Sequence, residues 1–375
     1  MKEGYLMQYR DFGSTGEKVS ALGFGCMRLP TNGSDRNINE DEAIKIIRHG
    51  IDEGVNYIDT AFFYHGGKSE GLVGKALLDG YREKVLLATK SPFAAFKIGF
   101  EFNKILKMQL KRLQTDHIDM YMLHAANLKA FKNSALKLDL ISKMEKAKAE
   151  GKIRYIGFSF HDDYEAFEEI LNAYHWDFCQ IQLNYIDVNN QAGIKGLELA
   201  AKKGIAVIVM EPLLGGKLAN PTENLIKALP QGVPPVQSAL DFIWSRKEVS
   251  LLLSGMSNSE QVEQNLKYAS ESSIGKLSDE DLEKFIDAKK VFDTMAKVSC
   301  TKCSYCMPCP AGVEVPEIFS AYNKSAIDVN DAKKQYAKIK GSAELCVKCK
   351  KCEAVCPQKI EISKVLEEAS DFLGK

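Results

Sequence analysis

The chain has 375 residues, of which 45% are hydrophobic, and its 50 basic and 50 acidic side chains leave no net charge. This length suits one large and one small domain, and the missing basic excess argues against a nucleic-acid-binding protein. Eight of the ten cysteines lie between Cys300 and Cys356. The composition therefore predicts a cysteine-poor body followed by a cysteine-dense tail.

The amino-terminal residues give the expected compartment. Met1 to Leu6 lack the apolar core of a signal peptide, and no apolar run approaches the ~20 residues that span a bilayer. We expect a cytoplasmic protein with neither a membrane nor a nucleic-acid partner. Reduced thiols in that compartment bind metal or do chemistry more often than they form structural disulfides.

Residues 7 to 270 alternate short apolar runs with amphipathic stretches. The runs are almost continuously hydrophobic, as strands covered on both faces are; they are Ala21–Cys26, Asn56–Thr60, Val85–Lys90, Ile118–His124, Tyr155–Phe160, Phe178–Asn184, Ala206–Glu211 and Ser250–Gly255. Eight strand–helix repeats in about 250 residues predict a (β/α)₈ barrel of the TIM type. The rival, a doubly wound sheet, would favour a third glycine in the stretch Gly23–Arg28.

Turn and cap residues add detail to this barrel. Asn39 with Glu42 predicts a capping box at the start of the first helix. Ahead of the first strand, residues Gln8–Ser20 contain a Gly13–Gly16 turn. That pattern predicts a hairpin that closes the bottom of the barrel.

Ionisable residues follow three successive predicted strands at their carboxyl ends. Asp59 ends the second strand, Lys90 the third and His124 the fourth, and Tyr64 lies in the loop after the second. Barrel enzymes place their chemistry at this end, so these side chains can converge. Alone, each has a structural reading as a helix cap, a solvent-reaching lysine or a structural histidine; their joint placement favours catalysis.

Hydride transfer to a carbonyl is the chemistry that needs such a set, because the developing alkoxide must receive a proton. Tyr64 is the candidate acid, and a nearby Lys90 ammonium is expected to lower its pKa from about 10. Asp59 would keep Lys90 charged and oriented. His124 could donate a hydrogen bond to the carbonyl oxygen.

The chain resembles the aldo-keto reductase family over about residues 7 to 270. The matching stretches are Leu22–Met27, Asp59–Tyr64, Leu87–Lys90, Asp119–His124, Gly157–Ser159, Gln180–Tyr185 and Gln261–Asn265. The resemblance implies a carbonyl substrate and NAD(P)H lying across the barrel mouth. By position, the four residues above match the family's catalytic tetrad. The cofactor-binding residues implied are Gly25, Met27, Ser159, Gln180, Met210, Gly255, Ser257, Gln261 and Asn265.

Three departures from the family pattern concern the cofactor. The usual Ser-Asn pair after the fifth strand is Ser159-Phe160, followed by His161, and the aromatic that often stacks on the nicotinamide is Met210 or Glu211. Gly255 and Gln261 occupy the places of the basic residues that clamp a 2′-phosphate. Because a phosphate without cationic partners binds poorly, the choice between NAD and NADP stays open.

The tail holds two cysteine runs, each followed by a proline. They are Cys300-x-x-Cys303-x-x-Cys306-x-x-Cys309 and Cys346-x-x-Cys349-x-x-Cys352-x-x-x-Cys356. The second is the ligand run of bacterial ferredoxins, in which the fourth cysteine serves the other cluster. Two [4Fe–4S] clusters are therefore expected, one on Cys300, Cys303, Cys306 and Cys356 and the other on Cys346, Cys349, Cys352 and Cys309. Zinc sites and disulfides are the alternatives.

The tail is expected to be a mainly helical, ferredoxin-like module. We place the barrel at residues 1–275, a helical connector at 276–299 and the iron–sulfur domain at 300–375. The connector is expected to contain a helix, Ser278–Lys297, that carries Leu282, Phe285, Ile286 and Phe292 on one face. From Lys297 onward, 13 lysines against 10 acidic residues give a net charge of +3. These lysines could dock an acidic carrier such as ferredoxin or flavodoxin, or could simply be solvated.

Three functions fit these patterns. In the first, the barrel reduces a carbonyl compound with Tyr64 as the acid, and the clusters are structural or sensory. In the second, the clusters pass electrons between the barrel site and a soluble carrier. The third is a non-catalytic redox-sensing subunit that binds the nucleotide.

Overall fold

The computed structural model describes residues 5–95, 101–295, 297–326 and 329–374. It separates into two compact units, one formed by residues up to Pro212 with Gln237–Ser278 and one formed by Leu213–Val236 with the residues from Asp279 onward. The segment Leu213–Val236 follows the seventh barrel strand in sequence but belongs to the second unit. The domain boundaries expected at 275 and 299 stay predictions.

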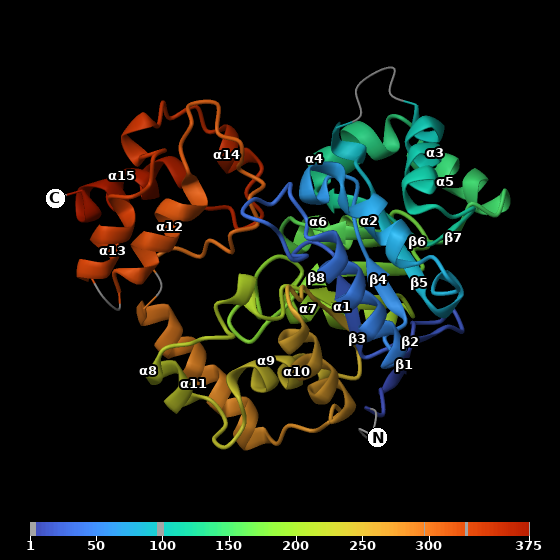
Figure 1. The fold of residues 1–375 in the computed structure, drawn as a ribbon, viewed down its shortest axis with the longest axis horizontal. Helices are drawn as coiled ribbons and strands as arrows, with labels where there is room; N and C mark the ends of the chain where they lie inside the picture. The colour runs from blue at the N-terminus through green and yellow to red at the C-terminus, as the bar shows by residue number, and fades with distance from the viewer. Residues whose placement is uncertain (1–4, 96–100, 296, 327–328, 375) are drawn as a thin grey trace. The chain divides into compact units, whose positions relative to one another are not determined.

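The first unit is a closed barrel of eight parallel strands (Figure 1). The strands, in chain order, are β3 (Leu22–Gly25), β4 (Tyr57–Asp59), β5 (Leu86–Ser91), β6 (Ile118–Ala126), β7 (Ile153–Phe160), β8 (Phe178–Gln182), β9 (Ala206–Met210) and β10 (Leu251–Ser254). Because β10 pairs with β3, the sheet closes on itself, which excludes the doubly wound sheet and confirms the predicted barrel. Each predicted strand is present within two residues of its expected bounds.

Helices surround this barrel (Figure 1). They are α1 (Glu40–Asp52), α2 (Ser69–Ala76), α3 (Phe102–Leu113), α4 (Leu128–Ala130), α5 (Leu140–Ala149), α6 (Tyr164–Asn172), α7 (Gly193–Lys202), α9 (Pro235–Trp244) and α10 (Ser259–Ser270). Half of the predicted capping box of α1 forms: the Asn39 side chain accepts a hydrogen bond from the Glu42 N–H, while the Asn39 N–H donates to Pro30. One of the N–H groups in the first turn of α1, which have no partner within the helix, is thereby hydrogen-bonded.

The predicted hairpin closes the bottom of the barrel. Strands β1 (Tyr9–Asp11) and β2 (Lys18–Ser20) pair antiparallel, and Phe12 between them is fully buried among the side chains that fill the barrel. Its ring centroid lies 5.6 Å from that of Phe178. The Ser14 N–H also donates to the Gly204 carbonyl at 2.9 Å. This bond connects the hairpin turn to the segment just before β9.

Within the residues that the structure describes, the second unit consists of helices joined by turns and irregular segments, without a strand. Its helices are α8 (Glu223–Ala228), α11 (Asp279–Met295), α12 (Val315–Lys324), α13 (Val329–Tyr336), α14 (Lys351–Ala354) and α15 (Ile362–Leu373). Buried residues such as Ile318, Phe319 and Leu366 form its core, against which six of the eight tail cysteines pack. This confirms the predicted helical tail. Within the described residues, no helix has the length and apolar character needed to cross a bilayer.

The predicted connector helix is present as α11, and its apolar face is only partly buried. In α11 only Phe285 of the four expected residues is buried, while Leu282 is 37% and Ile286 58% exposed. The reason is that α11 packs along the six-residue helix α8. A partner this short covers a narrower stripe than the apolar pattern offers.

The hairpin turn gives a matched test of the plug. A Cβ on Gly13 would lie 2.5 Å from the Gly204 oxygen, whereas one on Gly16 would meet nothing within 4 Å, although both residues have positive φ. We expect Gly16→Ala to cost about 1–2 kcal/mol from its left-handed backbone, and Gly13→Ala roughly 1–3 kcal/mol more from overpacking. Thermal unfolding followed by the fluorescence of Trp176 and Trp244, both buried in the barrel unit, measures the difference. Equal losses of unfolding free energy in the two variants would contradict the close packing of the hairpin turn against the bottom of the barrel.

Candidate functional site

A fully buried ammonium group marks the carboxyl ends of β4 and β5. Lys90 Nζ donates to Asp59 Oδ1 at 2.6 Å and to the Thr60 carbonyl at 2.9 Å, and its side chain has no exposed surface. Strand pairing holds these ends together, since Asp59 lies opposite Ala88 and the Thr60 N–H donates to the Ala88 carbonyl. Burial lowers the pKa of Lys90 and raises that of Asp59, and their mutual attraction opposes both shifts.

Tyr64 packs over this buried pair. The centroid of its ring lies 4.8 Å from Lys90 Nζ and 5.8 Å from the ring of His124, which it meets edge-on. The structure therefore brings the four predicted catalytic residues together. Burial raises the pKa of Tyr64 well above its usual value, and Asp59 and Glu211 raise it further. The pKa is therefore raised where a lowering by Lys90 was expected, and the phenol stays protonated.

His124 is positioned by an irregularity in β6. The register against β7 shifts between Leu123 and Ala126, and Ala125 has a φ of 52°. The hydroxyl of Ser159 accepts a hydrogen bond from the Ala125 N–H at 2.8 Å and so holds the bulge. Burial, Lys90 and a second histidine lower the pKa of His124 well below its usual value. The imidazole is neutral at neutral pH.

That second histidine, His161, follows β7 and was not assigned a role by the sequence argument. Burial lowers its pKa to about 4, and its Nδ1 lies 3.2 Å from Gln191 Oε1. The Gln191 amide in turn donates to Gln182 at 2.9 Å. The rule that found Lys90 and His124, an ionisable residue at a strand end, would have found His161 had it been extended past the fourth strand.

His65 is a further residue that sequence reasoning left without a role. It follows Tyr64 directly, is buried, and has a φ of 53°. Its Nε2 accepts the Leu29 N–H at 3.2 Å, so its Nδ1 carries the proton and donates to the Asp35 carbonyl at 2.7 Å. These bonds fasten the loop after β3 beside Tyr64. They join residues 36 and 30 positions apart, which no local pattern reveals.

The predicted nicotinamide-binding residues lie at the same end of the barrel. Gly25 and Ser159 stand in the carboxyl halves of β3 and β7, Gln180 lies in β8, Met210 ends β9, and half-buried Met27 follows β3. The Gln180 amide nitrogen lies 3.5 Å from the Met210 sulfur. Its amide oxygen is buried and makes no hydrogen bond within the described residues. A buried acceptor of this kind suits a ligand that brings an N–H group.

The predicted adenosine-phosphate residues gather around the loop after β10. The Ser257 N–H donates to Gln261 Oε1 at 2.8 Å, and the Asn265 amide donates to the Ser254 hydroxyl at 2.8 Å. The loop therefore runs over the first turns of α10, braced by side chains from that helix. Gly255 lies exposed within the loop.

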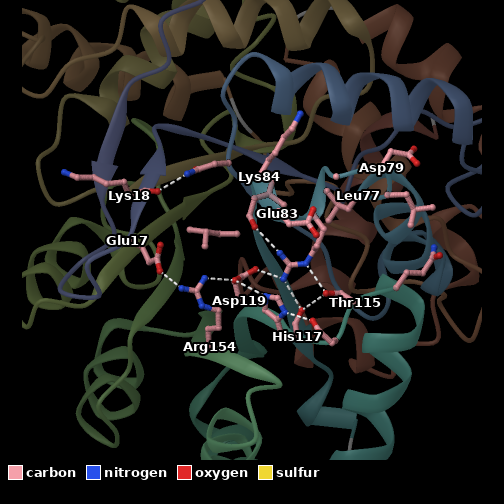
Figure 2. A pocket seen from close by; sticks show the side chains of 18 residues that line it. Glu17, Lys18, Leu77, Asp79, Glu83, Lys84, Thr115, His117, Asp119 and Arg154 are labelled. Carbon is pink, nitrogen blue, oxygen red and sulfur yellow. Dashed lines mark hydrogen bonds and ion pairs between the residues drawn. The ribbon is translucent and has the colours of Figure 1, made fainter.

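A cleft at the opposite end of the barrel is not the catalytic site (Figure 2). Its centre is the buried carboxylate of Asp119, which accepts from Arg82 and Arg154 at 2.8 Å each and from the Leu87 N–H at 2.9 Å. These residues stand at or near the amino-terminal ends of β5, β6 and β7. That face of such barrels serves stability, and the network holds neighbouring strands together.

The two cysteine runs share one backbone conformation. The residues two and four positions after the first cysteine have positive φ in both: Lys302 and Ser304 in the first run, Lys348 and Lys350 in the second. The fourth cysteines are also alike. The N–H three residues later bonds back to the carbonyl of Cys309 or Cys356, and α12 and α15 each begin six residues after these cysteines.

The structure brings one predicted ligand set together. Cys300, Cys303, Cys306 and Cys356 line a single pocket, and the last reaches it from the other run. Burial raises the pKa of the Cys306 thiol to about 12. In the second set, Cys346 and Cys352 lie close enough to influence each other. Among the described residues, no three His, Cys, Asp or Glu side chains are grouped tightly enough to hold one metal ion.

Gly215 is a support for the first run that sequence reasoning did not find. A Cβ at this residue would lie 2.2 Å from the Thr301 carbonyl oxygen, and its φ is 65°. Only glycine lets the segment after β9 approach the ligand loop this closely. The adjacent pair Gly215-Gly216 was the available signal.

Known proteins match both parts of the chain. Residues 21–289 match the aldo/keto reductase family and residues 299–361 a 4Fe-4S dicluster domain. L-galactose dehydrogenase of Arabidopsis thaliana is 30% identical over 290 residues, covering 71% of this chain and 89% of the relative. An aldo-keto reductase of Bacillus halodurans in its holo form has a TM-score of 0.64 and 29% identity, covering 75% of this chain and 96% of that one. An aldo-keto reductase of Klebsiella pneumoniae in complex with NADPH has a TM-score of 0.60 and 26% identity, covering 75% and 95%.

The buried pair at the strand ends can be tested by a double-mutant cycle. Lys90→Met leaves the Asp59 carboxyl buried without its partner, and Asp59→Leu leaves the Lys90 ammonium buried without a counter-charge. Each substitution should therefore destabilise the barrel by about 3–5 kcal/mol. The double variant should be less destabilised than the sum of the two by several kcal/mol. Thermal unfolding followed by tryptophan fluorescence gives the three values. Additive losses would show that the two groups do not depend on each other.

Proposed function

Because the chain belongs to the aldo/keto reductase family, we propose that it is a cytoplasmic NAD(P)H-dependent enzyme that reduces a small carbonyl compound at the carboxyl end of its barrel. The observation that carries the proposal is the convergence of Asp59, Tyr64, Lys90 and His124 around one buried ammonium. Hydride transfer to a carbonyl needs both a proton donor and a group that polarises the carbonyl oxygen. This cluster supplies both.

Tyr64 is the proton donor in this proposal. Its raised pKa keeps the phenol protonated until reaction, and the alkoxide formed by hydride transfer is a strong enough base to take that proton. The Lys90 ammonium, 4.8 Å from the ring centroid, then stabilises the phenolate that remains. Neutral His124 donates its ring N–H to the carbonyl oxygen and fixes its position. Asp59 keeps Lys90 charged and oriented toward the ring.

The residues present fit a nicotinamide cofactor, which would supply the hydride. The unpaired Gln180 oxygen is an acceptor for a carboxamide NH₂. Ser159, the other residue expected there, accepts from the Ala125 N–H and donates to the Leu123 carbonyl at 3.4 Å, so its hydroxyl must exchange that long bond to donate to a carboxamide oxygen. Met210, beside Gln180, can pack against a ring face in place of an aromatic side chain. Similarity to an NADPH complex supports the same cofactor class.

We propose that the tail carries two [4Fe–4S] clusters with the crossed ligand sets given above. The repeated backbone conformation of the two runs supports two equivalent sites, and the pocket shared by Cys300 and Cys356 supports the crossing. Zinc would require sulfurs about 2.3 Å from one ion, whereas the described cysteines form no such tight group. A cubane holds each thiolate on a different iron and so spaces them more widely.

A second candidate function is electron exchange between the clusters and an acidic one-electron carrier. The second cysteine run favours it, because Cys349 is exposed and exposed apolar residues flank it, with Val347 at 69% and Val355 at 52%. Lys350 and Lys351 add positive charge to the same stretch. Exposed apolar residues beside lysines in the same stretch suit an acidic protein partner.

Replacing the proposed acid tests the reductase function directly. Tyr64→Phe should lower kcat for carbonyl reduction by about 100- to 10,000-fold, the usual contribution of a general acid, while NADPH still binds. His161→Gln is the matched control, because it alters a polar group near His124 that does not donate the proton in this mechanism. Reduction at the wild-type rate in Tyr64→Phe would remove the phenol from the mechanism. Turnover of any carbonyl compound by the wild type would exclude the purely sensory alternative.

Counting iron tests the cluster proposal. An anaerobic preparation should contain about eight irons and eight sulfides per chain, and Cys349→Ser should lower both while Cys179→Ser, in the barrel core, should not. A wild-type value near four would mean that only one run forms a full site. If Cys349→Ser keeps full NADPH-linked carbonyl reduction, the clusters are not on the electron path of that reaction, and the second candidate function fails for it.

A further inference from the structure

A cationic side chain near the proposed cofactor site has no counter-charge among the residues that the structure describes. The Arg28 guanidinium makes no hydrogen bond or ion pair with any residue that the structure describes, and its Nη2 is buried. A guanidinium is charged at every physiological pH and presents five N–H donors. Leaving one of its nitrogens buried and unsatisfied costs free energy, so an anionic ligand is the expected partner.

The backbone places Arg28 at the loop after β10. The Arg28 carbonyl accepts the Ser257 hydroxyl at 2.7 Å, and the Arg28 side chain runs alongside Gly255. A Cβ at Gly255 would lie 3.2 Å from Arg28 Cβ and 3.4 Å from its Cγ. Glycine at this position therefore leaves room for the arginine. Arg28 belongs to the loop after β3, yet its side chain lies against the loop after β10.

The same edge carries the start of α10. The Asn258 side chain caps this 12-residue helix by accepting the Gln261 N–H. Its partial positive charge and the arginine lie at one edge of the barrel mouth. At the positions of Gly255 and Gln261, the aldo-keto reductase pattern has basic residues. Both residues are neutral in this chain.

We propose that Arg28 is the cation that binds a phosphate of the nicotinamide dinucleotide in this protein. Arg28, in the loop after β3, would supply the positive charge that the residues after β10 do not provide. The inference rests on the proposed function, because it requires that the barrel bind NADH or NADPH. A planar guanidinium can grip a phosphate through two parallel N–H bonds. Both the bridging diphosphate and a 2′-phosphate offer that chemistry.

Nucleotide binding, measured without turnover, tests the proposal. Isothermal titration calorimetry of the anaerobic full-length protein with NADH and with NADPH gives Kd for wild type, Arg28→Met and Arg28→Lys. Lys18→Met is the control, because it removes one positive charge from the exposed hairpin at the other end of the barrel. Arg28→Met should bind about 10- to 100-fold more weakly, as expected for one charge-assisted contact. Arg28→Lys should recover part of the loss, and Lys18→Met should match the wild type.

The two nucleotides distinguish which phosphate is bound. Equal weakening for NADH and NADPH assigns Arg28 to the bridging diphosphate, and weakening for NADPH alone assigns it to the 2′-phosphate; both support the proposal. Wild-type Kd values should also rise with salt more steeply than those of Arg28→Met. Unchanged Kd values for both nucleotides in a folded Arg28→Met protein would overturn the role of Arg28 alone. Failure of the wild type to bind either nucleotide would overturn this role and the proposed function together.

Discussion

Burial of the Lys90 ammonium constrains everything around it at the mouth of the barrel. Removing such a charge from water costs several kcal/mol unless close partners replace the solvent, and here Asp59 Oδ1 and the Thr60 carbonyl do so. Those partners require the register between β4 and β5. The same charge lies beneath the ring of Tyr64 and helps to keep His124 neutral. This buried cation thus fixes the register at the strand ends and contributes to the neutral state of His124, whereas burial and carboxylates keep Tyr64 protonated.

The cysteine unit depends on a comparable constraint. Its apolar core is small, and six tail cysteines pack directly against it, so the ligand loops and the core share side chains. Metal binding in such units contributes to folding itself, because the ligand set does not exist in the unfolded chain. The repeated positive φ values in the two runs show that both loops turn in the same way despite the shorter spacing before Cys309.

The strands and the four catalytic candidates could be predicted because parallel barrels combine a strong local signal with a simple rule. Each buried strand is a nearly continuous apolar run, and its last residues lie at the active end. What could not be predicted depends on contacts between distant segments. His65 acts on Leu29 and Asp35, and Arg28 meets Gly255 only once the barrel closes. The raised pKa of Tyr64 was missed because burial and neighbouring carboxylates are properties of the folded site.

The central claim is that hydride passes directly to a carbonyl carbon and that Tyr64 supplies the proton. The most direct measurement uses NADPH deuterated at the transferred position, with anaerobic protein and a carbonyl compound, and follows the label by mass spectrometry of the alcohol. Direct transfer predicts one deuterium retained on the carbinol carbon in every product molecule. Loss of the label to solvent, with unlabelled alcohol formed, would mean that electrons and protons travel separately, and would contradict the account.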